Sequence, residues 1–303
     1  MSPRLAGTVV VLWVSIVAAS GQETDTVRTA GSDIRILPIA HGTLGIVHGE
    51  NVILIDPARF VPAQPEVPRA DLQELAKAYL AKFGAPPPPT APDGEPVPEL
   101  LVSAVPVRSE QMAKFLGLKP PTLVLITHTH TDHLDPRAIA ALRTPVTQLI
   151  VPTHARGMLL DVQGALTMAN GERRVLGDIV VEAVPMYNMD PDPKLGSIFH
   201  PKGRGNGYVI SVADTRLYVA GDTGCTPEMM GLKDIDVAFV PMNLPYTMSP
   251  VQAAECVRTM KPKIVYPYHY FGSDLAVFQS ALQGTGIEVR IRDWYVGAKQ
   301  SSR

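Results

Sequence analysis

Short apolar runs alternate with amphipathic segments along most of the chain. Runs of three to six apolar residues, bounded by glycine, proline or polar residues, are typical of buried strands. We expect such strands at 34–39, 45–47, 52–55, 123–126, 148–152, 179–184, 208–212, 217–220, 237–240 and 263–266. Helices are best placed at 135–143, 249–260 and 274–283. Strands interleaved with helices in this way predict an α/β fold of mixed layers.

The helix at 249–260 carries clear start signals. Ser249 can cap it, Pro250 occupies its first turn, and Gln252 stands three residues after the cap. Its inner stripe includes Cys256, which we therefore expect to be a small buried residue. Cys225 is the only other cysteine, and the two could instead pair in an oxidising compartment.

The first twenty residues resemble a targeting segment. Arg4 supplies a positive charge, residues 5–18 are largely apolar, and Ala18-Ala19-Ser20 is a small-residue cleavage pattern. The apolar stretch is shorter than the roughly 20 residues that a spanning helix needs. We expect a signal peptide at 1–20, a periplasmic or secreted protein, and no stable membrane span after cleavage. An uncleaved membrane anchor is the alternative.

A proline-rich segment from 58 to about 121 interrupts the main domain, which we expect to span 34–298. The run Pro86 to Pro89 is stiff and extended. Apolar residues between Leu72 and Phe83 nevertheless follow a helical order, so the segment is expected to be a helical insertion. Such an insertion is either a lid that shapes substrate access or a surface decoration.

Composition limits the classes of partner. The chain has 303 residues, 46% of them hydrophobic, which is enough for one large domain or two small ones. A formal net charge of -2 gives no basic face for nucleic acid. We therefore expect a small-molecule substrate and no nucleic acid; the sequence does not indicate an oligomeric state.

The candidate chemistry is concentrated at 128–133, directly after the predicted strand 123–126. His128 and His130 alternate in an extended segment, so both can face one metal ion. Asp132 and His133 follow in the turn before a helix, where they can serve a second ion nearby. Imidazoles and carboxylates at this density are what a divalent metal centre needs.

Two more candidate ligands stand at the ends of later strands. Asp222 leaves its strand through a glycine turn, and its two oxygens could bridge two ions. His269 ends the last strongly apolar strand among aromatic residues. Either residue alone is an ordinary turn or core residue; the first cluster gives them weight as ligands.

Together these motifs resemble the metallo-β-lactamase-fold hydrolases. The order His-x-His-x-Asp-His, then Ala-Gly-Asp-Thr, then a strand-end histidine matches that family, and Asp56-Pro57 is similar to its first motif. Segments such as Tyr266-Pro-Tyr-His269 are similar to the branch that holds ascorbate-6-phosphate lactonase and N-acyl-phosphatidylethanolamine phospholipase D. The resemblance implies a four-layer αββα sandwich. It also implies a ligand set: His128 and His130 for the first ion, Asp132, His133 and His269 for the second, and Asp222 for both.

The sequence departs from the family where a third histidine for the first ion is expected. Asn188 stands there, and its carbonyl oxygen is a weak partner for zinc. His200 could fold back to fill the place, so both residues are candidates. Asp56 is a candidate acceptor behind a ligand imidazole, and Tyr187 and Tyr246 are candidate substrate contacts.

These inferences predict a hydrolase with two divalent metal ions, with zinc preferred over manganese or iron. A hydroxide bridging the ions would cleave an ester, lactone or phosphodiester bond, with Asp132 as the catalytic residue that orients it. One alternative is a di-iron redox centre, for which the chain shows no flavin module. The other is a degenerate metal-binding protein of the same fold without turnover.

Overall fold

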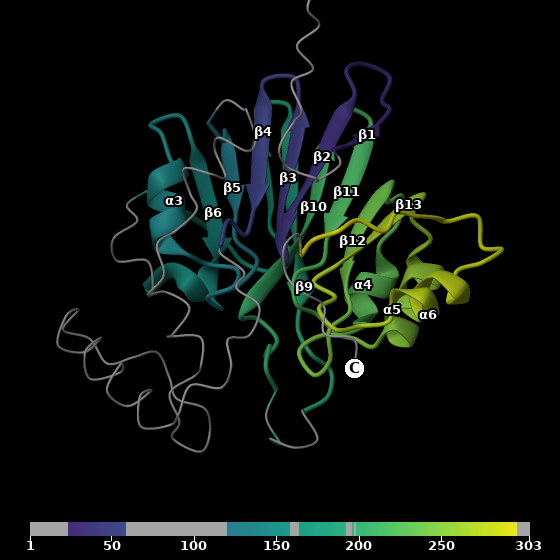
Figure 1. Ribbon diagram of the computed structural model, residues 1–303. Coiled ribbons are helices and arrows are strands. Elements are labelled where there is room, and N and C mark those ends of the chain that lie inside the picture. The colour runs from purple at the N-terminus through teal and green to yellow at the C-terminus, as the bar shows by residue number, and fades with distance from the viewer. Residues whose placement is uncertain (1–23, 59–119, 158–163, 192–195, 197, 296–303) are drawn as a thin grey trace, which may run out of the picture.

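The computed structural model describes residues 24–58, 120–157, 164–191, 196 and 198–295 (Figure 1). The predicted signal peptide at 1–20 and almost all of the predicted insertion lie outside the described residues. None of the helices in the described ranges is both long enough and apolar enough to cross a membrane.

The described strands form two seven-stranded sheets. The N-terminal sheet contains, in spatial order, β1 (Asp25–Val27), β2 (Ile34–Ala40), β3 (Thr43–His48), β4 (Asn51–Ile55), β5 (Leu123–Leu125), β6 (Gln148–Pro152) and β7 (Leu166–Met168). The C-terminal sheet contains, in spatial order, β14 (Glu288–Val289), β13 (Ile264–Tyr268), β12 (Val237–Pro241), β11 (Thr215–Val219), β10 (Gly205–Val212), β9 (Ile179–Met186) and β8 (Arg173–Leu176).

Each sheet has an antiparallel half and a parallel half. Strands β1 to β4 pair antiparallel, whereas β4 to β7 pair parallel. In the other sheet β8 to β11 pair antiparallel and β11 to β14 pair parallel. The carboxyl ends of neighbouring parallel strands meet at one edge of a sheet, which is where open α/β sheets present binding residues.

Helices cover the outer faces of both sheets (Figure 1). On the N-terminal sheet lie α3 (Pro136–Leu142) and the short 3-10 helix η2 (Thr153–Gly157); on the C-terminal sheet lie α4 (Pro227–Gly231), α5 (Pro250–Met260) and α6 (Leu275–Ala281). Alternation along β4 shows the layering. Leu54 belongs to the smaller core cluster that includes Ile139 of α3, whereas Ile53 and Ile55 belong to the larger core cluster that includes residues of β9 and β10. The predicted αββα sandwich is confirmed.

Most predicted elements lie within a few residues of the observed ones. Ser249 accepts from the backbone N–H of Gln252, and the Gln252 side chain accepts from the N–H of Ser249, so the expected capping box of α5 is present. Four observed strands, β1, β7, β8 and β14, were not predicted from the sequence; they have only two to four residues each. Strands this short carry little hydrophobic periodicity.

A disulfide joins Cys225 to Cys256, with 5.6 Å between their Cα atoms and a sequence separation of 31. The structure thus favours the pairing that the sequence left open. Cys225 lies in the turn that follows Asp222, and Cys256 lies on α5. The bond therefore ties the turn after a candidate ligand to a helix of the outer layer.

Reduction of this disulfide should destabilise the fold. Closing a loop of this length restricts the unfolded chain by roughly 3 to 4 kcal/mol in the chain-entropy model. We expect the urea midpoint to fall on adding reductant, and the Cys225→Ser/Cys256→Ala double variant to match the reduced protein. Two titratable thiols in the native, non-reduced protein would contradict the bond.

Candidate metal centre

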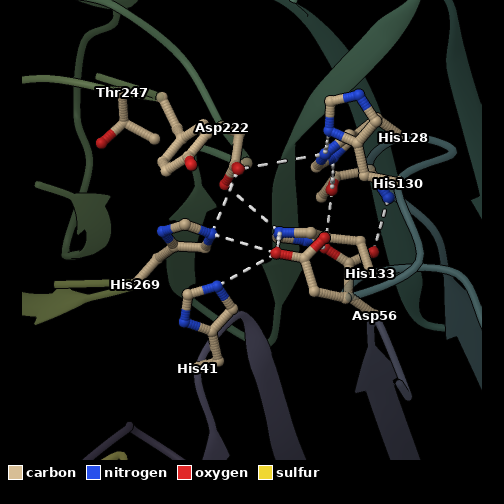
Figure 2. Close-up of polar contacts among 12 residues, drawn as sticks. His41, Asp56, His128, His130, His133, Asp222, Thr247 and His269 are labelled. Atoms are coloured by element: carbon tan, nitrogen blue, oxygen red, sulfur yellow. Dashed lines mark hydrogen bonds and ion pairs between the residues drawn. The ribbon is translucent and has the colours of Figure 1, made fainter. Parts of the chain in front are cut away.

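Most of the candidate site residues follow the carboxyl ends of parallel strands in both sheets, and His200 lies between the antiparallel strands β9 and β10. Asp56 follows β4 directly, and His128 comes three residues after the end of β5. In the facing sheet, Asp222 comes three residues after the end of β11 and His269 directly after β13. The sandwich therefore brings together residues that are far apart in sequence (Figure 2).

One group of imidazoles consists of His128, His130 and His200. His130 Nδ1 lies 3.1 Å from His128 Nε2 and 3.0 Å from His200 Nε2. All three nitrogens lie within 4.8 Å of one another, close enough to share one ion. We call this set the first group.

The two candidates for its third member have different places. His200 points its Nε2 into the group, whereas Asn188 stands behind it. Asn188 Oδ1 accepts from the backbone N–H of His200 at 3.0 Å and lies 2.9 Å from His200 Nδ1. Since Nδ1 then carries the ring hydrogen, Nε2 keeps its lone pair for a metal. Asn188 therefore lies behind His200, where its side chain can hold that imidazole in place.

Asp132, His133 and His269 form the second group. Asp132 Oδ2 lies 3.8 Å from His133 Nε2 and 3.7 Å from His269 Nε2. Asp56 lies where the sequence analysis expects an acceptor behind a ligand, because its Oδ2 is 2.7 Å from His133 Nδ1. Thr127 holds Asp56 in turn, since its backbone N–H and its hydroxyl both donate to the carboxylate. This chain of bonds leaves His133 Nε2 free to face the centre.

Asp222 lies between the two groups, as Figure 2 shows. Its Oδ2 is 3.6 Å from His200 Nε2 and 3.1 Å from His269 Nε2, and its Oδ1 is 3.4 Å from His133 Nε2. The side chain is almost completely buried, at 3% exposure. One carboxylate thus lies within reach of both sets of imidazoles, the arrangement that a bridging ligand requires.

Several buried polar atoms of this centre have no hydrogen-bond partner. They are His133 Nε2, His269 Nε2, His269 Nδ1 and Asp222 Oδ1. A buried polar atom without a partner costs roughly 1 to 3 kcal/mol. Three of these four are the atoms that the ligand hypothesis directs at a metal, so the residues present fit bound divalent ions.

Close backbone approach makes the centre compact. The Cα of Gly42 faces the ring of His133, and a Cβ at residue 42 would lie 2.5 Å from His133 Cε1. Gly221 has a φ of +66°, and a Cβ there would lie 2.5 Å from Met186 Sδ. A side chain at either position would displace His133 or the turn that carries Asp222.

Burial and charge split the pKa values of the imidazoles. Burial, helped by the neighbouring imidazole of His130, lowers the pKa of His200 to about 3, and burial also holds the pKa of His128 well below its ordinary value. Burial alone would lower the pKa of His269 as well, but the carboxylate of Asp222 raises it to about 9. The pKa of His133 is raised in the same direction by Asp222 and Asp132.

The carboxylates show the complementary shifts. Burial alone would raise the pKa of Asp222 and of Asp132, yet both lie well below the ordinary value because cationic His269 and His133 stabilise Asp222 and cationic His133 stabilises Asp132. Asp56 is different: burial raises its pKa despite the opposing effect of His133. In the absence of metal, protonated His133 and His269 therefore supply the positive charge that stabilises the carboxylates of Asp222 and Asp132.

The predicted substrate contacts lie near the first group but outside it. Tyr187 donates its hydroxyl to Glu228 Oε2 at 2.9 Å, and Lys202 Nζ lies 4.7 Å from the centre of its ring. Tyr246 is 44% exposed, and its carbonyl accepts from Asn188 Nδ2. Both remain predictions as substrate contacts.

His41 belongs to this centre but is not among the residues singled out from the sequence. It lies on the turn between β2 and β3, and its Nε2 is 3.1 Å from Asp132 Oδ2. Its Nδ1 is 2.8 Å from the hydroxyl of Tyr295, a residue that carried no signal in the sequence. The dipeptide His41-Gly42 between two strands was the available signal for His41.

Comparisons with known proteins identify the family of the chain. A family model described as the beta-lactamase superfamily domain matches residues 95–270. A UPF0173 metal-dependent hydrolase from Symbiobacterium thermophilum is 31% identical over 206 residues, covering 65% of this chain and 81% of that protein. The crystal structure of a protein described as a metal-dependent hydrolase from Parabacteroides distasonis aligns with a TM-score of 0.65 and 32% identity, over 89% of this chain and 98% of that one.

The chain belongs to the metallo-β-lactamase superfamily, and it is a metal-dependent hydrolase of that superfamily. A more distant likeness concerns the fold alone. The diiron β-hydroxylase CmlA from Streptomyces venezuelae aligns with a TM-score of 0.53 and 16% identity, over 87% of this chain and 53% of that one.

The metal-free protein should lose stability as the pH rises. The folded-state pKa of His269 is raised from 6.5 to about 9, so its contribution is complete below pH 6.5 and disappears as the pH passes about 9. The loss in the free energy of unfolding should not exceed roughly 3 kcal/mol. Urea midpoints measured with chelator at pH 6.5, 8 and 9.5 would show the decline, and His269→Gln should flatten it. A midpoint that rises over this range would contradict the assigned charges.

Proposed function

We propose that the two groups bind two divalent ions with Asp222 between them, and that the enzyme hydrolyses an ester, lactone or phosphodiester bond of a small molecule with a bridging hydroxide. The position of Asp222 carries the proposal, because its carboxylate lies within 3.6 Å of His200 Nε2 and within 3.4 Å of His133 Nε2. When bound, two such ions supply a nucleophile at neutral pH and stabilise developing negative charge.

The residues of the chain have separate parts in this proposal. His128, His130 and His200 hold the first ion, and Asp132, His133 and His269 hold the second. Asp132 is also the catalytic residue, because its carboxylate is 31% exposed while the histidines of its group are buried. A carboxylate at the open side of the centre can orient a nucleophile and accept its proton.

Zinc is the ion that these ligands favour. With His200 in place of Asn188, the first group offers three imidazole nitrogens, which is a common ligand set of catalytic zinc. An amide oxygen would have favoured manganese instead. The same observation weakens the proposal of a degenerate protein without turnover, whose main support was the missing third histidine.

The substrate class rests on the resemblance to the lactonase and phospholipase D branch. Hydrolysis of carboxylic esters, lactones and phosphodiesters shares one requirement, which is a developing oxyanion next to a cationic centre. Since the fold hosts many chemistries, the substrate has to be identified by experiment.

Elemental analysis and an activity screen test the proposed function. Protein purified without added metal should contain about two ions per chain and hydrolyse at least one chromogenic ester, lactone or phosphodiester. His130→Ala should lower turnover by at least about 100-fold and reduce the metal content, while its circular dichroism stays near that of the parent. His48→Ala is the matched control, because His48 lies at the far end of β3 and contacts Ser32.

Wild-type turnover in the His130→Ala variant would remove the centre from the reaction. Two tightly bound iron ions with a visible absorption band, and no hydrolysis across the panel, would instead favour a redox enzyme.

We also propose that the protein acts in the periplasm or outside the cell. The disulfide between Cys225 and Cys256 supports this location, since such bonds persist in oxidising compartments. Expression of the full chain with fractionation should place a shortened protein outside the cytoplasm, and mass spectrometry should find its N-terminus near residue 21. A full-length protein in the cytoplasm with free thiols would contradict this location.

A further inference from the structure

The turn between β2 and β3 of the N-terminal sheet lies against His269, the member of the second group that follows β13 of the C-terminal sheet. Its residue His41 donates its backbone N–H to the carbonyl of Trp294 and accepts from the backbone N–H of His269, both at 3.2 Å. The His41 ring lies against that of His269, with 3.5 Å between the ring centres. Figure 2 shows the two imidazoles side by side, facing the centre.

His41 makes the shortest of three imidazole contacts to the carboxylate of Asp132. His41 Nε2 lies 3.1 Å from Asp132 Oδ2, compared with 3.7 Å for His269 and 3.8 Å for His133. The other two imidazoles leave their Nε2 atoms without a hydrogen-bond partner, whereas His41 Nε2 forms a hydrogen bond. His41 therefore differs from His133 and His269 because its Nε2 is engaged by Asp132, although the ligand atoms of all four residues lie within 4.8 Å of one another.

The neighbours of His41 indicate which ring nitrogen carries the hydrogen. The backbone N–H of Phe271 donates to the Tyr295 hydroxyl oxygen at 3.0 Å. That hydroxyl can then donate its own hydrogen to His41 Nδ1, 2.8 Å away. With Nδ1 as acceptor, a neutral imidazole carries its hydrogen on Nε2 and donates it to Asp132.

The backbone of His41 is held in an unfavourable conformation. His41 has a φ of +48°, and it is one of six residues other than glycine with positive φ in the described ranges. Two of the other five, Asp56 and His269, belong to the same centre. Strain of this kind, at roughly 1 to 3 kcal/mol per residue, persists where the surroundings enforce it and often marks a functional constraint.

We propose that His41 is a positioning residue for Asp132, and that Tyr295 sets its tautomer. Asp132 is the most exposed member of its group and lies on the loop after β5, so its carboxylate needs an external contact to fix its orientation. The Nε2–H of His41 supplies that contact, and the hydroxyl of Tyr295 keeps the hydrogen on the correct nitrogen. This inference rests on the proposed function, because it concerns Asp132, the residue that we propose orients the nucleophile.

Three variants test the contacts that run from Tyr295 through His41 to Asp132, each with a matched control. Tyr295→Phe removes only the hydroxyl, and its control is Tyr218→Phe, because the Tyr218 hydroxyl is buried and has no hydrogen-bond partner. His41→Asn shortens the donor but suits a positive φ, whereas His41→Gln keeps both reach and donor. His48→Gln is the control for the histidine variants.

We expect His41→Asn to lower kcat by about 10- to 100-fold with KM changed by less than about twofold, because loss of a supporting contact misplaces a reacting group without removing substrate contacts. His41→Gln should recover part of the loss, and Tyr295→Phe should lower kcat several-fold and shift the pH profile of kcat. Both controls should match the parent enzyme.

Two further readouts do not depend on turnover. Nitrogen-15 spectra of the metal-loaded protein should show the Nε2–H tautomer for His41 and a change in Tyr295→Phe. The His41 and Tyr295 variants should retain about two ions per chain but release them to a chelator faster than the parent and the controls do. An Nδ1–H tautomer would overturn the proposal, and so would loss of a whole ion in His41→Gln, since that would make His41 a ligand.

The outcomes separate this inference from the proposed function. A parent enzyme without bound metal and without hydrolysis would refute the proposed function. The positioning role of His41 and Tyr295 alone would be refuted if the parent enzyme binds metal and hydrolyses its substrate but the His41 and Tyr295 variants behave like their controls.

Discussion

The centre depends on one constraint: the carboxylate of Asp222 is buried, and no described lysine or arginine forms an ion pair with it. The side chain of Asp222 is 3% exposed, and every ion-pair partner that the described residues give it is a histidine. Burying such a charge is costly unless a positive charge lies next to it. Protons on His133 and His269 can supply that charge, but the orphaned Nε2 atoms of the same residues show that a divalent ion would satisfy the arrangement more completely.

The fold meets this constraint by combining strand ends from two sheets. Parallel strands β4 and β5 deliver Asp56 and the 128–133 loop, and β11 and β13 deliver Asp222 and His269. The residues behind the candidate ligands matter as much as the ligands. Asp56 orients His133, and Asn188 orients His200, so each group is supported by a polar side chain that does not face the centre.

Much of this was predictable from the sequence because it depends on local pattern. The strand before His128, the capping box at Ser249 and the glycine turn at Asp222 each follow from a few neighbouring residues, and the family motifs supplied the αββα arrangement. The choice between Asn188 and His200 was not predictable, because it depends on how the chain returns between β9 and β10. The role of Tyr295 was even less predictable. It reaches the centre only through the packing of the C-terminal segment, and no sequence pattern around it indicates that contact.

The placement of the centre across both sheets affects the whole domain. His41 bonds through its backbone to His269 and Trp294, so the N-terminal sheet is fastened to the C-terminal sheet at the same place where the candidate ligands meet. The two layers cannot separate without dismantling the centre. Bound ions would therefore stabilise the sandwich as a whole, and its resistance to unfolding would follow the supply of free metal in the surroundings.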